Sequence, residues 1–468
     1  MRQMQKRGAG ALAAVLLATA LAGCAGGNKA TTGGDNEELQ PPQAQAEQKT
    51  KVTLWTHQSN LKDKMTELIT AYNDTNEDGV EIELNVVADK YNDVLSLAFS
   101  TKEGPDIFSI TGPSSTQKAA ENGWVQPLND YMTDDFKARF RDGVWVENNN
   151  VIGDQIYTLP DQASTMRLMY NKALFEQAGL DPEQPPQTFE ELREFAQRIT
   201  EASGGAAAGL GLPMGDGYYT DVILMNGMGY NAIGVNRGFD HRQGRFDFEP
   251  YRPLLELTRQ IEQDGSMLKG ALLVSSDQGR AKFAEGEIGI IGGASWDPGI
   301  FASMDIGFDV GVAAFPTIDG EPRGKSTIQM GSGYAMSAFA EDKDKAWKAM
   351  EYLYSPAFMG EIMKTVGGIS LLNEVAEDPA YQSDVPLLEH YQIVEADGVW
   401  PPFPPGLKLQ GDTMQSVFMQ VINGQKEIDA ALSDLTKRYN EAFERGISEG
   451  AFRREDFTIA DFDPLQLQ

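Results

Sequence analysis

Apolar and polar residues alternate with two different periods early in the chain. Short apolar runs with strand-like spacing occur at 51–55, 80–87 and 107–110. Between them lie two segments, 61–73 and 91–101, in which apolar residues recur every three or four positions, as in an amphipathic helix. Strands that alternate with helices predict an α/β fold, in which a mostly parallel sheet is covered by helices.

The helical spacing recurs in the rest of the chain. The segment that begins near Thr188 has a capping residue followed by acidic residues, Glu190 and Glu191, which is typical of a helix start. A length of 468 residues predicts two or three domains. Further helices are predicted at about 188–202, 251–264, 344–354, 413–423 and 427–445.

Polar residues follow the predicted first and third strands. His57, Gln58 and Ser59 come after the first strand, and Gly112 comes after the third. Ligands of open α/β sheets bind outside the carboxyl ends of the strands. These residues are therefore candidates for contact with a ligand.

The N-terminus has a separate pattern. A basic start precedes an apolar run from Ala9 to Leu21, which ends in Gly23 and the single cysteine, Cys24. This layout predicts an export signal over 1–23, and small residues directly before a cysteine are typical of lipoprotein signals. We expect Cys24 to be lipidated, with palmitate among its acyl chains, and to tether the protein to the outside of the cell membrane. An ordinary secretion signal with an incidental cysteine is the alternative.

Composition limits what the rest of the chain does. Residues 24–50, rich in Gly, Gln, Pro and Glu, predict a flexible tether, and no later apolar run approaches the roughly 20 residues of a spanning helix. Removal of 1–23, which holds three basic and no acidic residues, changes the net charge from −30 to −33. Such acidity argues against nucleic acid and against an anionic bilayer as partners. With Cys24 lipidated, no disulfide remains possible within the chain.

Five groups of short motifs occur in order between residues 50 and 445. They are Gly-Pro-Asp-Ile-Phe at 104–108, the pair 156–160 and 170–175, the pair 178–181 and 185–192, Phe-Ala-Glu-Gly at 283–286 with Ala-Ser-Trp at 294–296, and the stretch 421–432. In this order, the motifs resemble extracellular solute-binding protein family 1, whose members capture carbohydrates for ABC importers. The resemblance implies a binding protein without enzymatic activity, a monomer that docks on the importer's membrane permease.

The resemblance also implies an α/β, two-lobed periplasmic-binding-protein-like fold (type II), with a mostly parallel sheet flanked by helices in each lobe and a hinge between the lobes. Crossings between the lobes would fall near 163–166, 313–315 and 355–356. The implied partition is 51–162 plus 316–355 for lobe 1, 163–315 plus 356–450 for lobe 2, and 451–468 for a C-terminal tail.

A sugar cleft needs aromatic plates for the apolar C–H faces and polar groups for the hydroxyls. Trp296, between Ser295 and Asp297 in a Gly-rich stretch, is the first candidate plate, and a core position is the alternative for each aromatic residue. The other candidate plates are Tyr218, Tyr219, Trp400 and Trp55. Candidate polar contacts are Gln58, Ser59, Ser164, Asp216, Asp297, His57 and Arg167, with Gly112, Gly333 and Tyr334 from the strand ends.

Three other functions compete with carbohydrate binding. Residues 74–79 fit the first half of a calcium loop, but Asn85 stands where the bidentate glutamate belongs, so an acidic turn is the simpler interpretation. A secreted glycoside hydrolase would need only a carboxylate pair, which composition does not exclude. The same fold could instead bind a peptide, a polyamine or an anion. We expect neither a cofactor nor a metal.

Overall fold

The computed structural model describes residues 49–88, 90–110, 113–147, 149–331, 333–404 and 406–467. The predicted signal, Cys24, nearly all of the predicted tether and Gly112 lie outside these residues. The described strands form two larger sheets with helices packed against them, and the largest buried apolar clusters are associated with these sheets.

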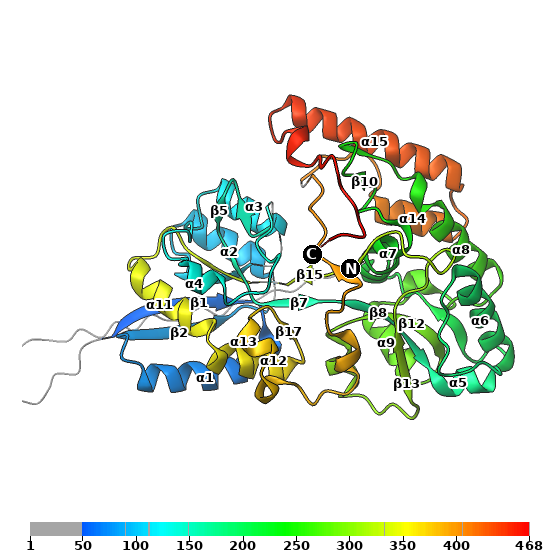
Figure 1. Ribbon diagram of the computed structural model, residues 1–468, viewed down its shortest axis with the longest axis horizontal. Helices are drawn as coiled ribbons and strands as arrows, with labels where there is room; N and C mark the ends of the chain where they lie inside the picture. Colours follow the sequence, from blue (N-terminus) through cyan, green and yellow to red (C-terminus); the bar gives the residue numbers. More distant parts are fainter. Residues whose placement is uncertain are drawn as a thin grey trace, which may run out of the picture. The chain divides into compact units, whose positions relative to one another are not determined.

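The first sheet has the order β2 (Val80–Val86), β1 (Thr50–Thr56), β3 (Ile107–Ile110), β16 (Gly333–Met336) and β6 (Leu159–Pro160). Strand β1 runs parallel to β2 and β3, whereas β16 is antiparallel to β3 and β6. Helices α1 (Lys62–Thr75) and α11 (Lys343–Leu353) pack against the β1–β2 side of this sheet (Figure 1). Helix α2 (Tyr91–Ser100) buries Tyr91, Leu95 and Phe99, which lie four residues apart on one face.

The second sheet has the order β13 (Val310–Ala313), β8 (Met166–Asn171), β12 (Ile288–Ala294) and β9 (Ala208–Gly211). Helix α6 (Phe189–Ala202) packs on β9, α8 (Arg252–Gln263) packs on α6, and α9 (Ser276–Ala284) packs on β12. Helices α14 (Met414–Ile422) and α15 (Ile428–Ser448) pack on α8 (Figure 1). The central strands β8 and β12 are buried along their whole length, as expected for strands covered on both faces.

Shorter elements complete the fold. The helices among them are α3 (Pro113–Glu121), α4 (Asp134–Lys137), α5 (Lys172–Gln177), α7 (Gly229–Ile233), α10 (Asp297–Phe301), α12 (Glu361–Val366), α13 (Asn373–Ala376) and the π-helices η2 (Tyr219–Met228) and η5 (Pro356–Gly360). Short 3-10 helices are η1 (Ser59–Leu61), η3 (Glu249–Tyr251), η4 (Ala271–Leu273), η6 (Pro379–Tyr381), η7 (Leu388–Tyr391) and η8 (Arg454–Asp456). The paired short strands are β4 (Val151–Ile152) with β5 (Gln155–Ile156), β10 (Phe239–Asp240) with β11 (Arg245–Phe246), and β14 (Ser326–Thr327) with β18 (Asp397–Gly398).

The helices and strands predicted from periodicity are all present, with bounds shifted by at most a few residues. The predicted cap of α6 is a complete capping box: Thr188 accepts a hydrogen bond from the Glu191 amide, and the Glu191 carboxylate accepts one from the Thr188 amide. Helix α9 and the π-helix η2 were not predicted. The Ser275-x-x-Gln278 pattern does form a capping box at the start of α9 and was the signal for that helix.

The expectation of mostly parallel sheets was wrong. In the second sheet only β12 and β9 run parallel, and β8 is antiparallel to both of its neighbours. The first sheet has two parallel and two antiparallel pairings. Strand β16 follows β13 of the second sheet in the sequence but pairs in the first sheet. Its direction therefore depends on how the chain returns from one sheet to the other. Local strand–helix alternation does not encode it.

Packing also differs from the expected partition near residue 356. The segment 356–376, expected in lobe 2, contributes Phe358, Ile362 and Leu372 to the same buried cluster as Val52 and Leu54 of β1. Helix α12 lies against α1, so the apolar side chains of this segment are covered by the first sheet's helices. The segment therefore packs with lobe 1.

A small antiparallel sheet is formed by chain segments that connect the first sheet with the second. Strand β7 (Gln162–Ser164) is central and pairs with β15 (Gln329–Met330) and β17 (Ile369–Ser370) (Figure 1). The crossing expected near 163–166 would overlap the end of β7. The other two crossings, expected at 313–315 and 355–356, are displaced, because the partners of β7 come from 329–330 and 369–370.

Residues 451–467, the C-terminal strap, pack back on the body of the protein. Phe457 and Phe462 are buried, the Ile459 amide donates to the His241 carbonyl at 2.8 Å, and the Lys325 amide donates to the Pro464 carbonyl at 2.8 Å. The predicted tail is thus an integral part of the fold. Throughout the described chain, every helix is too short or too polar to cross a bilayer.

Candidate functional site

Polar side chains lie together near the carboxyl ends of β1 and β3. His57 Nδ1 lies 2.9 Å from Ser109 Oγ, and its ring centroid lies 5.5 Å from that of Tyr91. The Tyr334 hydroxyl donates to Gln58 Oε1 at 3.2 Å, which joins β16 to the loop after β1. Burial lowers the pKa of His57, so its imidazole is neutral at physiological pH.

Other predicted residues of this group differ in exposure. Ser59 is exposed at the start of η1, and Trp55 is half-buried against the cluster that contains Tyr91. Gly333 is buried between β3 and β6, where a Cβ would lie 2.0 Å from the Leu159 carbonyl oxygen. The need for glycine at 333 is therefore explained by strand packing.

The turn after β12 presents Trp296 beside Tyr218. Both side chains are half-buried, and their ring centroids lie 6.2 Å apart with an interplanar angle of 61°. Tyr219 packs on Tyr218 at 5.3 Å and is fully buried. The structure therefore brings Trp296 and Tyr218 together as an aromatic corner, and Tyr219 lies in the core behind it.

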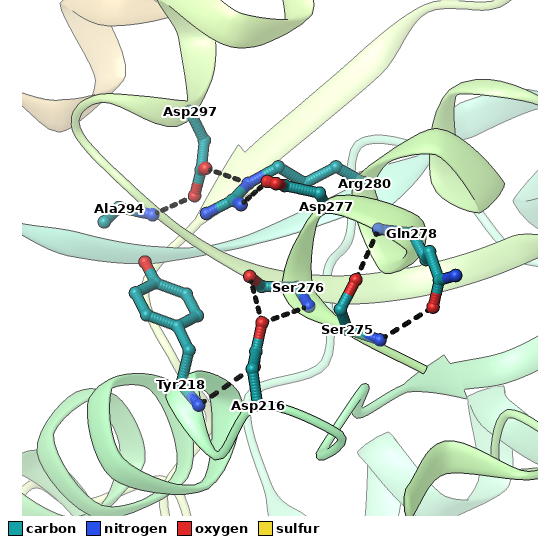
Figure 2. A network of polar contacts seen from close by, with 9 residues as sticks. All are labelled: Asp216, Tyr218, Ser275, Ser276, Asp277, Gln278, Arg280, Ala294 and Asp297. Carbon is teal, nitrogen blue, oxygen red and sulfur yellow. Dashed lines mark hydrogen bonds and ion pairs between the residues drawn. The ribbon is translucent and has the colours of Figure 1, made fainter. Parts of the chain in front are cut away.

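A polar network holds this corner (Figure 2). Arg280 of α9 donates from Nε to Asp297 Oδ1 at 2.6 Å, and the Ala294 amide donates to Asp297 Oδ2 at 2.7 Å. The Arg280 guanidinium also lies over the Tyr218 ring, 5.2 Å from its centroid. Asp297 is fully buried, and burial raises the pKa of its carboxyl against the opposing charge of Arg280. Because internal partners occupy both carboxylate oxygens, Asp297 supports the corner rather than contacting a ligand as predicted.

Asp216 fastens the loop that carries Tyr218 to the first turn of α9 (Figure 2). Its carboxylate accepts hydrogen bonds from the Tyr218 amide at 3.1 Å, the Ser276 amide at 2.8 Å and the Ser276 hydroxyl at 2.6 Å. Partial burial raises the pKa of Asp216, but these hydrogen bonds outweigh burial, so that the pKa lies below its usual value. Asp216 is therefore ionised, and its main role is to connect the loop of Tyr218 to the start of α9.

Three buried tyrosine hydroxyls lie close to the same carboxylate. Within the described part of the chain, the Tyr218, Tyr219 and Tyr391 hydroxyls have no hydrogen-bond partner, and the charge of Asp297 helps to raise the pKa of all three, after burial. A methyl group on Gly293 would come within 2.9 Å of the Tyr391 hydroxyl and 3.1 Å of Asp297 Oδ2. The glycine before the turn thus lets these groups approach. Sequence reasoning missed Arg280, Ser276 and Tyr391, none of which lies in the motifs that carry the family resemblance.

Trp400 lies elsewhere, in a separate cluster. It is 7% exposed, packs against Tyr230 at 4.6 Å and Phe462 at 5.8 Å, and donates from Nε1 to the Lys325 carbonyl at 2.9 Å. Other side chains of the protein cover its apolar surface, and a backbone carbonyl accepts the hydrogen bond from its N–H. Trp400 is therefore an anchor for the C-terminal strap rather than the ligand plate that the sequence predicted.

Arg167 and Ser164 lie near the small antiparallel sheet. Arg167 makes five hydrogen bonds, two to Asp397 and three to the carbonyls of Met166, His390 and Gln392. A guanidinium has five donors, so none is left for a ligand, and the predicted contact is corrected to a structural ion pair. Ser164 is buried in β7, opposite Gln329.

Residues 74–79 comprise the last two residues of α1 and the turn that leads to β2. The Asn76 side chain donates to the carbonyls of Tyr72 and Val80, and Asp78 accepts from the Tyr72 hydroxyl. Among the residues with described positions, no group of three or more His, Cys, Asp or Glu side chains is arranged to hold a metal ion.

The arrangement defines the class of protein: the fold is that of two-lobed solute-binding proteins. The crystal structure of a cyclic alpha-maltosyl-1,6-maltose binding protein from Arthrobacter globiformis superimposes with a TM-score of 0.67, covering 85% of this chain and 100% of that one at 22% identity. The chain belongs to the bacterial extracellular solute-binding protein family, whose model matches residues 58–359. Membership of this family fits a location outside the cytoplasm.

Two relatives are similar over most of their length. A putative binding protein of Brucella abortus (strain 2308) is 26% identical over 327 residues, which cover 70% of this chain and 77% of the relative. The maltotriose-binding protein of Pyrococcus abyssi is 25% identical over 363 residues, which cover 74% and 72%. Both are named as binding proteins rather than as enzymes.

Proposed function

We propose that this chain captures a mono- or oligosaccharide between its two lobes and delivers it to the membrane permease of an ABC importer. Capture and closure are the whole activity, and no bond is broken. The aromatic corner of Trp296 and Tyr218 carries the proposal, because two half-buried rings held by a buried ion pair are suited to the apolar faces of a sugar ring. The names of the maltotriose- and maltosyl-maltose-binding proteins support the class of ligand.

The polar side of the ligand would be met from the first lobe. His57 and Gln58 follow β1, and the neutral imidazole and the amide both offer donors and acceptors to sugar hydroxyls. In a closed cleft, a hydroxyl without a partner costs roughly 1–3 kcal/mol, so these two side chains would contribute to specificity. We propose that this polar group and the aromatic corner contact opposite sides of one sugar.

The N-terminal pattern supplies the proposed location. Lipidation of Cys24 would hold the protein at the outer face of the cell membrane, and the tether up to residue 50 would let the lobes reach the permease. We propose that the protein acts as a monomer whose contact with the membrane is the lipid alone.

A thermal-shift screen tests the function. The chain from residue 24 with Cys24→Ser would be heated with maltotriose, other oligosaccharides and monosaccharides, and with peptides, polyamines and organic phosphates as controls. A ligand at 100 times its dissociation constant should stabilise the fold by about 2.7 kcal/mol. A shift with one class of sugar is the expected result.

The other outcomes separate the alternatives. A shift with a peptide, a polyamine or a phosphate alone would keep the fold and refute the sugar. A glycan that is consumed during the assay, with products detected by chromatography, would show a glycoside hydrolase instead. Protein that is unfolded with denaturant and refolded before the screen excludes a ligand carried over from expression.

A further inference from the structure

Helix α9 contacts both segments that form the aromatic corner. At its first turn, the Ser276 amide and hydroxyl bind Asp216, which also accepts from the Tyr218 amide. One turn further on, Arg280 binds Asp297, the residue after Trp296 (Figure 2). The capping box of Ser275 and Gln278 closes the start of α9 and makes it a firm support for both contacts.

Arg280 contacts both parts of the aromatic corner, the Tyr218 ring and the turn that holds Trp296. Its guanidinium lies over the Tyr218 ring, and its Nε binds Asp297 Oδ1. The other oxygen of Asp297 accepts from the Ala294 amide, which closes the turn in which Trp296 sits. The side chain of Arg280 is 6% exposed and that of Asp297 is 0% exposed. Removing two charges from water costs free energy, and well-packed apolar residues in place of a buried ion pair often give a protein of equal stability. Stability alone therefore does not explain this ion pair.

We propose that Arg280 is a positioning residue for ligand capture, which sets the angle between the rings of Tyr218 and Trp296 without touching the ligand. This inference rests on the proposed function of the corner. A plate that is held in its binding orientation before the ligand arrives loses less conformational entropy on binding. A looser corner would therefore bind the same sugar more weakly, even if the fold kept its stability.

Arg280→Lys is the test variant, because lysine keeps the charge against Asp297 and loses the planar fork and the stacking on Tyr218. The matched control is Arg193→Lys, since Arg193 binds both oxygens of Asp264 between α6 and α8, away from the corner. Both variants would be made in the chain from residue 24 with Cys24→Ser. If Arg280→Lys does not fold, Asp297→Asn replaces it, because the amide oxygen still accepts from Ala294.

Two measurements are made on each variant. Isothermal titration gives the affinity for maltotriose, or for the ligand class found in the screen. Fluorine NMR of 5-fluorotryptophan protein reports on the six tryptophans, and the spectrum of Trp296→Phe identifies the resonance of Trp296. We expect Arg280→Lys to weaken binding at least tenfold and to shift or broaden the Trp296 resonance, and Arg193→Lys to change neither.

Affinity of Arg280→Lys within twofold of the Arg193→Lys value would overturn the proposal, whether or not the Trp296 resonance moves. An unchanged resonance with weakened binding would overturn it too, because Arg280 would then act on the ligand itself. If the parent chain binds no ligand of any tested class, the proposed function fails. The resonance alone then decides whether Arg280 sets the position of Trp296.

Discussion

Trp296 and Trp400 each lie two residues beyond the last residue of a strand, in irregular chain, but their surroundings differ. Trp400 is sandwiched near Tyr230 and Phe462, and its indole N–H is bonded to a carbonyl. Trp296 is only half-buried, and its turn is held by hydrogen bonds to Asp297 rather than by rings on both sides. Aromatic packing uses up the surface of one indole, whereas a polar network fixes the backbone and leaves the other partly open.

The difference shows how a protein can hold an aromatic side chain without covering it. Apolar packing stabilises the fold in proportion to the area that it buries, so a well-packed indole has little surface left for a ligand. Hydrogen bonds to the backbone of a turn fix the position from which the side chain projects, and they cover little of the side chain itself. The two tryptophans should therefore respond in opposite ways to mutation, one through stability and the other through binding.

The largest effect is expected for Trp400→Ala. Loss of the ring removes its contacts with Tyr230 and Phe462 and should lower the free energy of unfolding by about 3–5 kcal/mol, measured by urea denaturation. Trp400→Phe, which keeps a ring and loses the N–H, should cost less than half as much. Ligand affinity of the folded fraction should be unchanged. A Trp400→Ala variant as stable as the parent would mean that the strap does not depend on this anchor.

Trp296→Ala should act on binding instead. The unliganded protein should keep its fold, and the stabilisation of about 2.7 kcal/mol by ligand at 100 times the dissociation constant should disappear in a thermal-shift assay. Trp145, half-buried in the first lobe beside Phe140, provides the control: Trp145→Ala should lower the melting temperature and keep the shift. Normal binding by Trp296→Ala would refute the aromatic corner as the site.

A smaller effect is expected from pH in the region of Trp400. His241 is buried beside Phe462, and its burial lowers its pKa to about 4. The unfolded chain takes up a proton near pH 6.5 but the folded chain only near pH 4, so stability falls as the pH drops through this window. The loss should reach about 2 kcal/mol at pH 5.

His241→Gln should flatten this dependence, because the amide does not titrate. Urea denaturation of both proteins at pH 7.5, 6 and 5 gives the difference in slope. Parallel curves would mean that His241 already carries a proton in the fold, or that water reaches it.

Local sequence was enough for many of the helices and strands, but not for α9 or η2. Periodicity predicted β1 and α1, and the pattern at Thr188 predicted the helix cap of α6. Local sequence was not enough for Asp297 and Arg167, two polar residues near the expected site. Both make hydrogen bonds to other side chains of the protein instead. A side chain's partner lies far away in the chain, and a local pattern carries no information about it.

What the sequence by itself determined is the order of helices and strands and the family to which the chain belongs. Both follow from residues that are close together in the chain, where spacing dictates which side chains share a face. Only the tertiary structure decided which tryptophan is open and that Arg280 stands behind the corner. The bond between Asp216 and Ser276 spans 60 residues, and that between Arg167 and Asp397 spans 230. Contacts of this kind exist only once the sheets and helices have packed.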